Sequence, residues 1–189
     1  LEQPVERLFV NKKSIVNQRQ IGRDVNSYKE GLLNCLEEDV DVVYIGGIVE
    51  ELSDNLQLIL DLAAGNCLVV LEMDTKNSVR TIEKMLNIMQ KNRSLEASCH
   101  MLADTLLAIF SQKLIPNKQK GLSLALEVLL VNSSVKSMLR DNKIYQLESV
   151  MENFADEGMM SMSRSIRNLV QDGKIEEQEV EKLNLDVEV

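Results

Sequence analysis

The sequence predicts an α/β fold followed by a small helical domain, and three observations carry that prediction. Short apolar runs at residues 42–45 and 67–71 alternate with segments of helical periodicity. Each run is continuous, as is typical of strands in a parallel sheet that is buried on both faces. After Pro116 the helical pattern dominates. We therefore expect a partial parallel sheet flanked by helices over residues 1–116 and a mainly helical domain over residues 117–189.

The elements expected in the first part alternate between strands and helices. A polar turn at residues 22–24 follows the first strand, and Gly46 and Gly47 end the second. A helix through Tyr28, Leu32 and Leu36 lies between these two strands, because its apolar residues recur at helical spacing. The expected strands are residues 14–18, 41–47 and 67–71, and the expected helices are residues 27–37, 55–64, 81–90 and 94–114.

The second part begins where Pro116, Asn117 and Gly121 gather, since these residues favour a loop. Residues 122–131 are expected to add one strand at the edge of the first unit. Ser133 or Ser134 can cap a following helix, and Gly173 can end the last one. The expected helices are residues 133–140, 144–154 and 161–172.

Composition and charge exclude several classes of protein. The 189 residues carry a net charge of −9 and 3% aromatic residues, which disfavours nucleic-acid binding. Cys35, Cys67 and Cys99 form no C-x-x-C pair, so we expect free thiols in the cytoplasm. No apolar stretch approaches the roughly 18 residues that a membrane span needs. The chain opens on Leu1 rather than Met, which suggests that it is part of a longer protein.

Four segments, in order along the chain, closely resemble the type IV pilus retraction ATPases, the PilT-like branch of the hexameric secretion ATPases. The first resembles a signature of that family, and the second resembles its Walker B strand. The third is similar to the segment after the family's histidine box, and the fourth is similar to a helix that in the family is tied to pilus retraction. They are SIVNQRQIGRD at 14–24, EDVDVVYIG at 38–46, TKNSVRTI at 75–82 and VKSMLRDNK at 135–143. Gly158, Met159 and Met162 continue the resemblance, which covers nearly the whole chain.

The resemblance implies the C-terminal half of a RecA-like motor domain followed by a helical domain. In the family, ATP and Mg²⁺ bind between a glycine-rich phosphate loop, the Walker B strand, an aspartate box and a histidine box. Six subunits form a cytoplasmic ring that drives pilus disassembly together with pilus or secretion platform proteins, at the inner face of the membrane. The phosphate loop needs G-x-x-x-x-G-K-[ST], which this sequence lacks, and in the family it lies upstream of the matched region.

Several residues depart from the family at the positions of its catalytic groups. Gly47 stands at the Walker B glutamate, which in the family polarises the attacking water and helps to order Mg²⁺. Gln3 replaces the aspartate of the aspartate box, although Glu2 is kept. Val49 and Glu37 replace arginines, and Cys67 and Asp74 replace the two box histidines. Because the apolar scaffold is retained, the pattern predicts a motor fold that has lost catalysis.

The remnants of the nucleotide site expected from the resemblance have alternative roles. Glu2 either contacts the ligand or is a frayed residue at the terminus. Arg19 either lines the nucleotide or subunit interface or forms a structural ion pair. Asp74 is either a relocated acid near the γ-phosphate or a loop residue that caps the next helix. The predicted remnants are Glu2, Arg19, Asp41, Gly46, Gly47 and Asp74.

Outside the nucleotide site, Lys136, Arg140 and Lys143 form a basic stripe that is either a partner surface or a solvated face. The single histidine, His100, has no neighbouring ligands in the sequence, so we expect no metal site. Cys67 is expected to be a buried core thiol.

Three functions remain open. The chain is a catalytically degenerate ring or regulatory subunit, assembled as a homo-oligomer or with an active paralogue. Alternatively it belongs to an active ATPase whose phosphate loop lies upstream, or it is an interaction domain without a nucleotide role.

Overall fold

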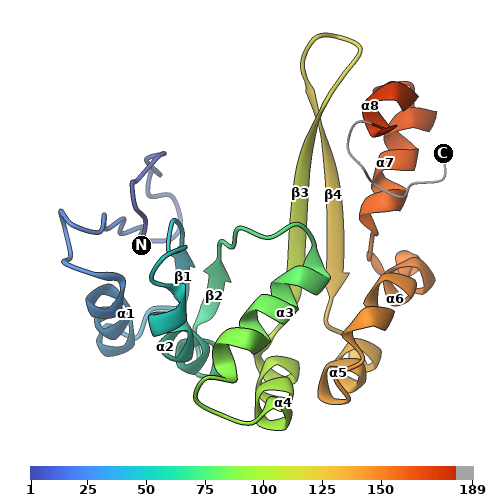
Figure 1. Ribbon diagram of the computed structural model, residues 1–189. Coiled ribbons are helices and arrows are strands. Elements are labelled where there is room, and N and C mark those ends of the chain that lie inside the picture. The colour runs from blue at the N-terminus through green and yellow to red at the C-terminus, as the bar shows by residue number, and fades with distance from the viewer. Residues whose placement is uncertain (182–189) are drawn as a thin grey trace. The chain divides into compact units, whose positions relative to one another are not determined.

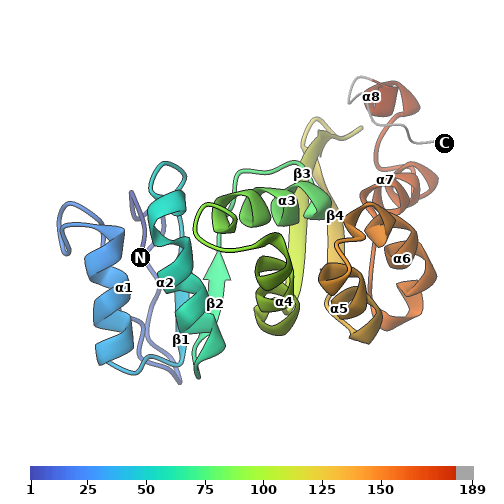
Figure 2. The same ribbon diagram turned by 60° about the horizontal axis from the view of Figure 1, so that its bottom comes forward.

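The computed structural model describes residues 1–181, which form two compact units (Figure 1). The first unit comprises residues 1–74 with residues 87–92. The second comprises residues 75–86 and the chain from residue 93 onward. Each unit has its own strands and helices, which Figure 2 shows from a second direction.

The first unit is built on a parallel pair of strands, as the alternating pattern predicts. β1 (Val42–Ile45) pairs with β2 (Leu68–Leu71), so that Val42 lies beside Leu68. α1 (Tyr28–Glu37) packs against α2 (Leu52–Ala64), which in turn packs against β2. α1 begins where Ser27 Oγ accepts a hydrogen bond from the backbone N–H of Glu30.

Two short stretches continue the sheet beyond β1. The backbone N–H of Gly46 donates to the carbonyl of Leu1 at 2.9 Å, and that of Ile21 donates to the carbonyl of Glu2 at 3.0 Å. Glu2 and Gln20 form an isolated parallel bridge. The chain's first residues therefore lie between β1 and the predicted turn, which Gly22 forms with φ +81°.

The predicted strand at residues 14–18 is wrong, because side-chain amides take the backbone hydrogen bonds that a strand would use. The N–H of Val16 donates to Asn11 Oδ1, and the N–H of Phe9 donates to Gln18 Oε1. Ile15 and Val16 are consequently exposed in an irregular segment.

The strands of the first unit are also less buried than a continuous apolar run predicts. Val43 and Ile45 of β1 are buried, whereas Val42 and Tyr44, which point to the other face, are exposed. Leu68 and Val70 of β2 are exposed in the same way. The described residues of this unit therefore cover one face of the sheet well and leave the other open.

The second unit contains a long antiparallel hairpin that the sequence did not predict. α3 (Ser78–Met89) begins in this unit, and α4 (Leu95–Thr105) follows. The helix expected at 94–114 is wrong beyond Thr105, since β3 occupies Ala108–Pro116. β4 (Leu122–Leu130) is confirmed as a strand, but it pairs with β3 and not with the first unit. Asn117 Oδ1 closes the turn by accepting from the backbone N–H groups of Gln119 and Gly121.

Helices complete the second unit largely as predicted. Asn132, rather than Ser133 or Ser134, caps α5 by accepting from the N–H of Val135. Ser161 caps the helix that ends before Gly173, whose φ is +69°. The helical elements after the hairpin are α5 (Ser133–Arg140), a 3-10 turn (Ile144–Gln146), α6 (Leu147–Asn153), a second 3-10 turn (Ala155–Glu157), α7 (Met162–Gln171) and α8 (Glu177–Glu181).

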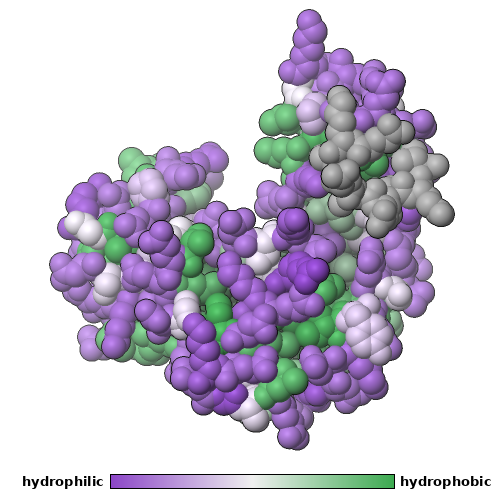
Figure 3. Space-filling view, in the orientation of Figure 1, coloured by the Kyte–Doolittle hydropathy of each residue, from purple (hydrophilic) through white to green (hydrophobic). Residues whose placement is uncertain are grey.

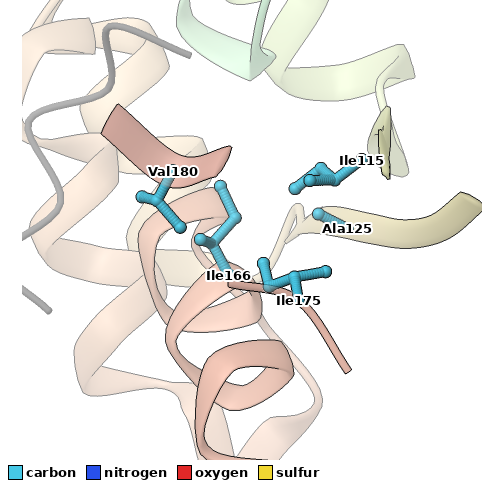
Figure 4. Packing of buried hydrophobic residues seen from close by; sticks show 5 residues of the cluster. All are labelled: Ile115, Ala125, Ile166, Ile175 and Val180. Carbon is cyan, nitrogen blue, oxygen red and sulfur yellow. The ribbon is translucent and has the colours of Figure 1, made fainter. Parts of the chain in front are cut away.

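One face of the hairpin packs against the last helices. Ile115 of β3 and Ala125 of β4 form a buried cluster with Ile166, Ile175 and Val180 (Figure 4). Residues 117–120, near the domain boundary expected at Pro116, form the turn of this hairpin. That boundary stays a prediction. Residues 182–189 lie outside the described residues.

Candidate functional site

The candidate site is the carboxyl end of β1, the edge of a parallel sheet at which α/β proteins bind their ligands. β1 ends at Ile45, and Gly46 and Gly47 follow it. The hydroxyl of the buried Tyr28 donates to the carbonyl of Gly46 at 2.5 Å, while the N–H of Gly46 is bonded to Leu1. Both backbone polar groups of Gly46 are therefore held by neighbouring segments.

Gly47 occupies a conformation and a space that exclude any side chain. Its φ is +74°, a region that glycine adopts freely and other residues rarely adopt. A Cβ at this position would lie 2.6 Å from the main-chain oxygen of Gln3 and 3.2 Å from the Tyr28 hydroxyl. Since a main-chain oxygen cannot rotate away as a side chain can, any other residue at this position would force the backbone to shift.

The carboxylate of Glu72, which the sequence analysis did not predict, also lies at this edge. Glu72 directly follows β2, and its Oε2 accepts a hydrogen bond from the Tyr44 hydroxyl at 3.0 Å. A Cβ on Gly46 would lie 2.9 Å from the same Glu72 oxygen. The signal that could have identified Glu72 is an acid immediately after a predicted parallel strand.

The pKa values of the two tyrosines at this edge are raised, first by burial and then by nearby carboxylates. Burial, together with the nearby carboxylates of Glu51, Glu72 and Glu2, raises the pKa of Tyr28 to about 12. Burial and the hydrogen bond to Glu72 raise the pKa of Tyr44 to about 12. A polyphosphate bound at this edge of the sheet would lie close to these carboxylates.

No family model matches the chain, but its relatives are clear. It is 30% identical over 176 residues to a twitching motility protein of Neisseria gonorrhoeae, which covers 93% of this chain and 46% of that protein. It is 26% identical to the type IV pilus retractation ATPase PilT of Pseudomonas aeruginosa, over 93% of this chain and 50% of PilT. A crystal structure of the pilus retraction motor PilT with bound ADP matches 97% of this chain with a TM-score of 0.86 and 30% identity.

The chain is a homologue of the PilT-like pilus retraction ATPases. It spans about half the length of the curated relatives that it matches, and 51% of the PilT chain in the crystal structure. The Legionella pneumophila ATPase DotB matches with a TM-score of 0.80 at 17% identity, which supports the fold alone. The expected α/β fold with a parallel sheet flanked by helices is therefore confirmed.

The structure brings some of the predicted remnants of the PilT-like site together and separates others. Glu2 lies near Gly46 and Gly47, where its carboxylate accepts a hydrogen bond from Gln18 Nε2 at 3.0 Å. Asp41 precedes β1 and so lies at the opposite end of the strand. Asp74 is exposed at the end of the first unit.

Arg19 forms an ion pair, as one of its two predicted roles requires. Its Nη2 lies 2.7 and 2.9 Å from the two carboxylate oxygens of Glu38, just after α1. The guanidinium is thus engaged within the first unit. Cys67 is half-buried before β2, so the prediction of a core thiol is wrong, although burial raises the pKa of its thiol.

The basic stripe of the second unit is partly neutralised. Arg140 pairs with Asp104 at 2.7 Å, and Lys143 pairs with Asp141 at 2.8 Å. The hydrogen bond from Arg140 lowers the pKa of Asp104, and Lys136 adds to this effect. These pairs are exposed and contribute little to stability, so the stripe's role as a partner surface stays a prediction.

The residues present do not form a complete MgATP site. The sequence has no phosphate loop, Gly47 cannot carry a carboxylate, and carboxylates line the edge of the sheet. Within residues 1–181 no group of His, Cys, Asp and Glu is arranged to hold a metal ion. No helix in that range has the length and apolar character needed to cross a membrane.

Tyr28 is expected to make the stability of the protein sensitive to alkaline pH. Its pKa in the folded state, about 12, exceeds the value of about 10 in an unfolded chain. Below pH 10 both states keep the proton, whereas between pH 10 and 12 the unfolded state loses it first and unfolding is favoured. The free energy of unfolding, measured in urea, should therefore decrease less from pH 8 to pH 11.5 in Tyr28→Phe than in wild type.

The control for this measurement is Tyr145→Phe, because Tyr145 is exposed and distant in sequence from the site. This variant should show the wild-type decline. An equal decline in wild type and Tyr28→Phe would mean that the Tyr28 hydroxyl is not buried against Gly46.

Proposed function

We propose that this chain is part of a non-catalytic PilT-like subunit, which acts by assembly in pilus retraction or secretion. In this role it is a structural or regulatory member of a hexameric ring, as a homo-oligomer or beside an active paralogue. Its partners are that ATPase and the proteins of a pilus or secretion platform, at the cytoplasmic face of the inner membrane. ATP and Mg²⁺ are bound by the active subunits and not by this chain alone.

The observation that carries the proposal is the close approach of Gln3 to Gly47. At the position aligned with the Walker B glutamate, a Cβ would lie 2.6 Å from a main-chain oxygen. At this position the backbone of the chain therefore leaves no room for a side chain unless it shifts.

The electrostatics of the same edge support the proposal. Glu2, Glu51 and Glu72 all act on Tyr28, and Arg19 is paired with Glu38. The two arginines expected from the family are Glu37 and Val49 in this chain. An ATP polyphosphate would face repulsion here where the family supplies positive charge.

One observation favours an active ATPase as the second candidate. The Glu72 carboxylate lies within 2.9 Å of the place where a Cβ on Gly46 would stand, next to the Walker B position. A carboxylate there could orient a water molecule in place of the missing glutamate. In that case Glu72→Gln would lower the turnover of a completed enzyme by about 10²-fold or more.

Assembly with an active motor is the property that tests the proposed role. The tagged chain is expected to co-purify with full-length Pseudomonas PilT and to change the MgATP turnover of PilT in proportion to the amount added. Lys136→Glu with Lys143→Glu provides a variant of the predicted partner surface, and Lys118→Glu with Lys120→Glu in the hairpin turn provides a control of equal charge change. The complex is expected to have a Kd of about 1 μM, so the chain is added at about ten times that concentration. If the chain then neither associates with PilT nor changes its turnover, the assembly role is contradicted.

A further inference from the structure

The first unit carries a basic loop, residues 7–18, whose apolar side chains lie in solvent. Leu8 is 81% exposed, Val10 is 80% exposed and Ile15 is 91% exposed, and Phe9 keeps 58% of its surface. Single exposed apolar residues are common on protein surfaces, whereas a contiguous exposed group is typical of a binding surface. The basic loop is therefore a candidate contact site.

Side-chain hydrogen bonds hold the basic loop in shape. Gln18 Nε2 donates to the carbonyl of Arg7 at 2.9 Å, and Gln18 Oε1 accepts from the N–H of Phe9 at 2.7 Å. Within the loop, Asn11 Oδ1 accepts from the N–H of Val16 at 2.8 Å. Figure 3 shows hydrophobic side chains beside hydrophilic ones at the upper edge of the first unit, where Figure 1 draws the first residues of the chain in dark blue. The loop thus presents its apolar side chains on a backbone that its own amides fix.

The charge of the basic loop is opposite to that of the whole chain. The loop contains Arg7, Lys12 and Lys13 and no Asp or Glu, whereas the chain carries a net charge of −9. All three cations are exposed, and within residues 1–181 none of them forms a salt bridge. Even with Glu6 directly before it, the segment stays positive. The basic loop therefore suits an anionic partner.

We propose that the basic loop binds the surface of an anionic lipid bilayer, with Leu8, Phe9 and Val10 inserted among the lipids. Apolar side chains accompanied by cations are typical of segments that lie in the bilayer interface. An anionic leaflet attracts each nearby lysine or arginine, and this attraction acts within about 8 Å at physiological salt. Acids that lie farther from the bilayer are screened, so the net charge of the chain does not prevent binding. The inference goes beyond the proposed function, because it needs no ATPase partner.

A protein surface and a nucleic acid fit the basic loop less well than a bilayer does. A standard protein interface takes about 20–30 residues from each partner, which is more than residues 7–18 supply. A fluid bilayer needs no complementary shape to receive three apolar side chains. Bases of a nucleic acid stack on aromatic side chains, and Phe9 is the one aromatic residue of the loop. An acidic protein surface is one of the outcomes that the experiment distinguishes.

The test is sedimentation of the full chain with vesicles of phosphatidylcholine that contain about 30% phosphatidylglycerol. We expect binding to these vesicles, and at least about tenfold weaker binding to pure phosphatidylcholine or at about 1 M salt. The double variant Lys12→Gln with Lys13→Gln should bind about tenfold more weakly than wild type, because it loses two attracted cations. Phe9→Gln should also lose about tenfold, because it removes the largest inserted side chain.

Two matched controls make the same chemical changes elsewhere. Lys118→Gln with Lys120→Gln removes two exposed cations from the hairpin turn, and Leu36→Gln removes an exposed apolar side chain from α1. Both controls should bind within about threefold of wild type. Equal losses in loop and control variants would mean that binding is not located at the basic loop, and would overturn the proposal.

A tryptophan reporter reads insertion directly. Because the chain contains no tryptophan, Phe9→Trp supplies the only indole signal. Its emission should shift to the blue with anionic vesicles and be quenched by brominated lipid, whereas Tyr145→Trp, at an exposed position, should show neither effect. Absence of vesicle binding, equal binding to neutral vesicles, or a Phe9→Trp spectrum that shifts with soluble polyglutamate and not with vesicles would each overturn the proposal. Because only the chain and lipid are present, failure here is distinct from failure of the assembly with PilT.

Discussion

Replacing Gly47 by alanine is expected to lower the free energy of unfolding by about 2–5 kcal/mol, because two costs combine. A non-glycine residue at φ +74° costs about 1–2 kcal/mol. The added Cβ would also lie 2.6 Å from the Gln3 main-chain oxygen, which forces a backbone shift costing about 1–3 kcal/mol. Urea unfolding followed by circular dichroism measures the sum.

Gly22→Ala separates the two costs. Gly22 has a similar φ of +81°, but a Cβ there would meet nothing within 4 Å. This variant should lose only the conformational term of about 1–2 kcal/mol. If the two substitutions cost the same, the close approach at Gly47 does not exist in solution, and the argument for a closed site loses its basis.

The same geometry governs attempts to restore catalysis. Gly47→Glu places the family's carboxylate in the correct position of the sequence, but on a backbone that cannot hold its Cβ without moving. We expect this variant to be destabilised like Gly47→Ala and to gain no turnover.

Glu127→Ala is expected to lower the free energy of unfolding by about 2–4 kcal/mol. Glu127 on β4 is buried, and one of its carboxylate oxygens accepts from the N–H and the hydroxyl of Ser78 at 2.6 and 2.5 Å. It therefore joins the start of α3 to the hairpin of the second unit. Alanine would leave the buried Ser78 donors without this acceptor and would open a cavity.

Two further variants identify the cause of that loss. Glu127→Gln keeps a carbonyl oxygen of similar reach and should lose less than Glu127→Ala. Ser78→Ala removes one of the two donors, and its cost should not add to that of Glu127→Ala in a double-mutant cycle, since the pair acts together. Additive costs would mean that the two residues do not interact.

Helix caps and apolar periodicity depend on residues that are close together in the sequence, and the helices that they specify were predicted. Ser27 caps α1, and the apolar residues Leu56 and Ile59 of α2 are buried. On α1 the predicted apolar face is only partly right, because Tyr28 and Leu32 are buried whereas Leu36 is exposed. The hairpin was missed because the run from Leu106 to Phe110 is apolar without a break, which fits a helix or a strand. Only the pairing of β3 with β4 decides between them, and that pairing is long-range information.

The candidate site shows the same limit. Resemblance to the family drew attention to Gly47, but its φ and the approach of Gln3 come from segments that are distant in the sequence. Tyr28 and Glu72 reach this edge from α1 and from the end of β2. No periodicity or motif places a tyrosine hydroxyl on a carbonyl 18 residues away.

The central claim, that the chain has a motor fold without catalysis, is tested most directly by steady-state MgATP turnover. The protein to measure is this chain joined to the half of Pseudomonas PilT that carries the phosphate loop, once cooperative unfolding shows that it is folded. PilT serves as the positive control and a phosphate-loop variant as the background. We predict turnover no higher than background, whereas turnover that Glu72→Gln abolishes would contradict the claim and establish Glu72 as the substitute carboxylate.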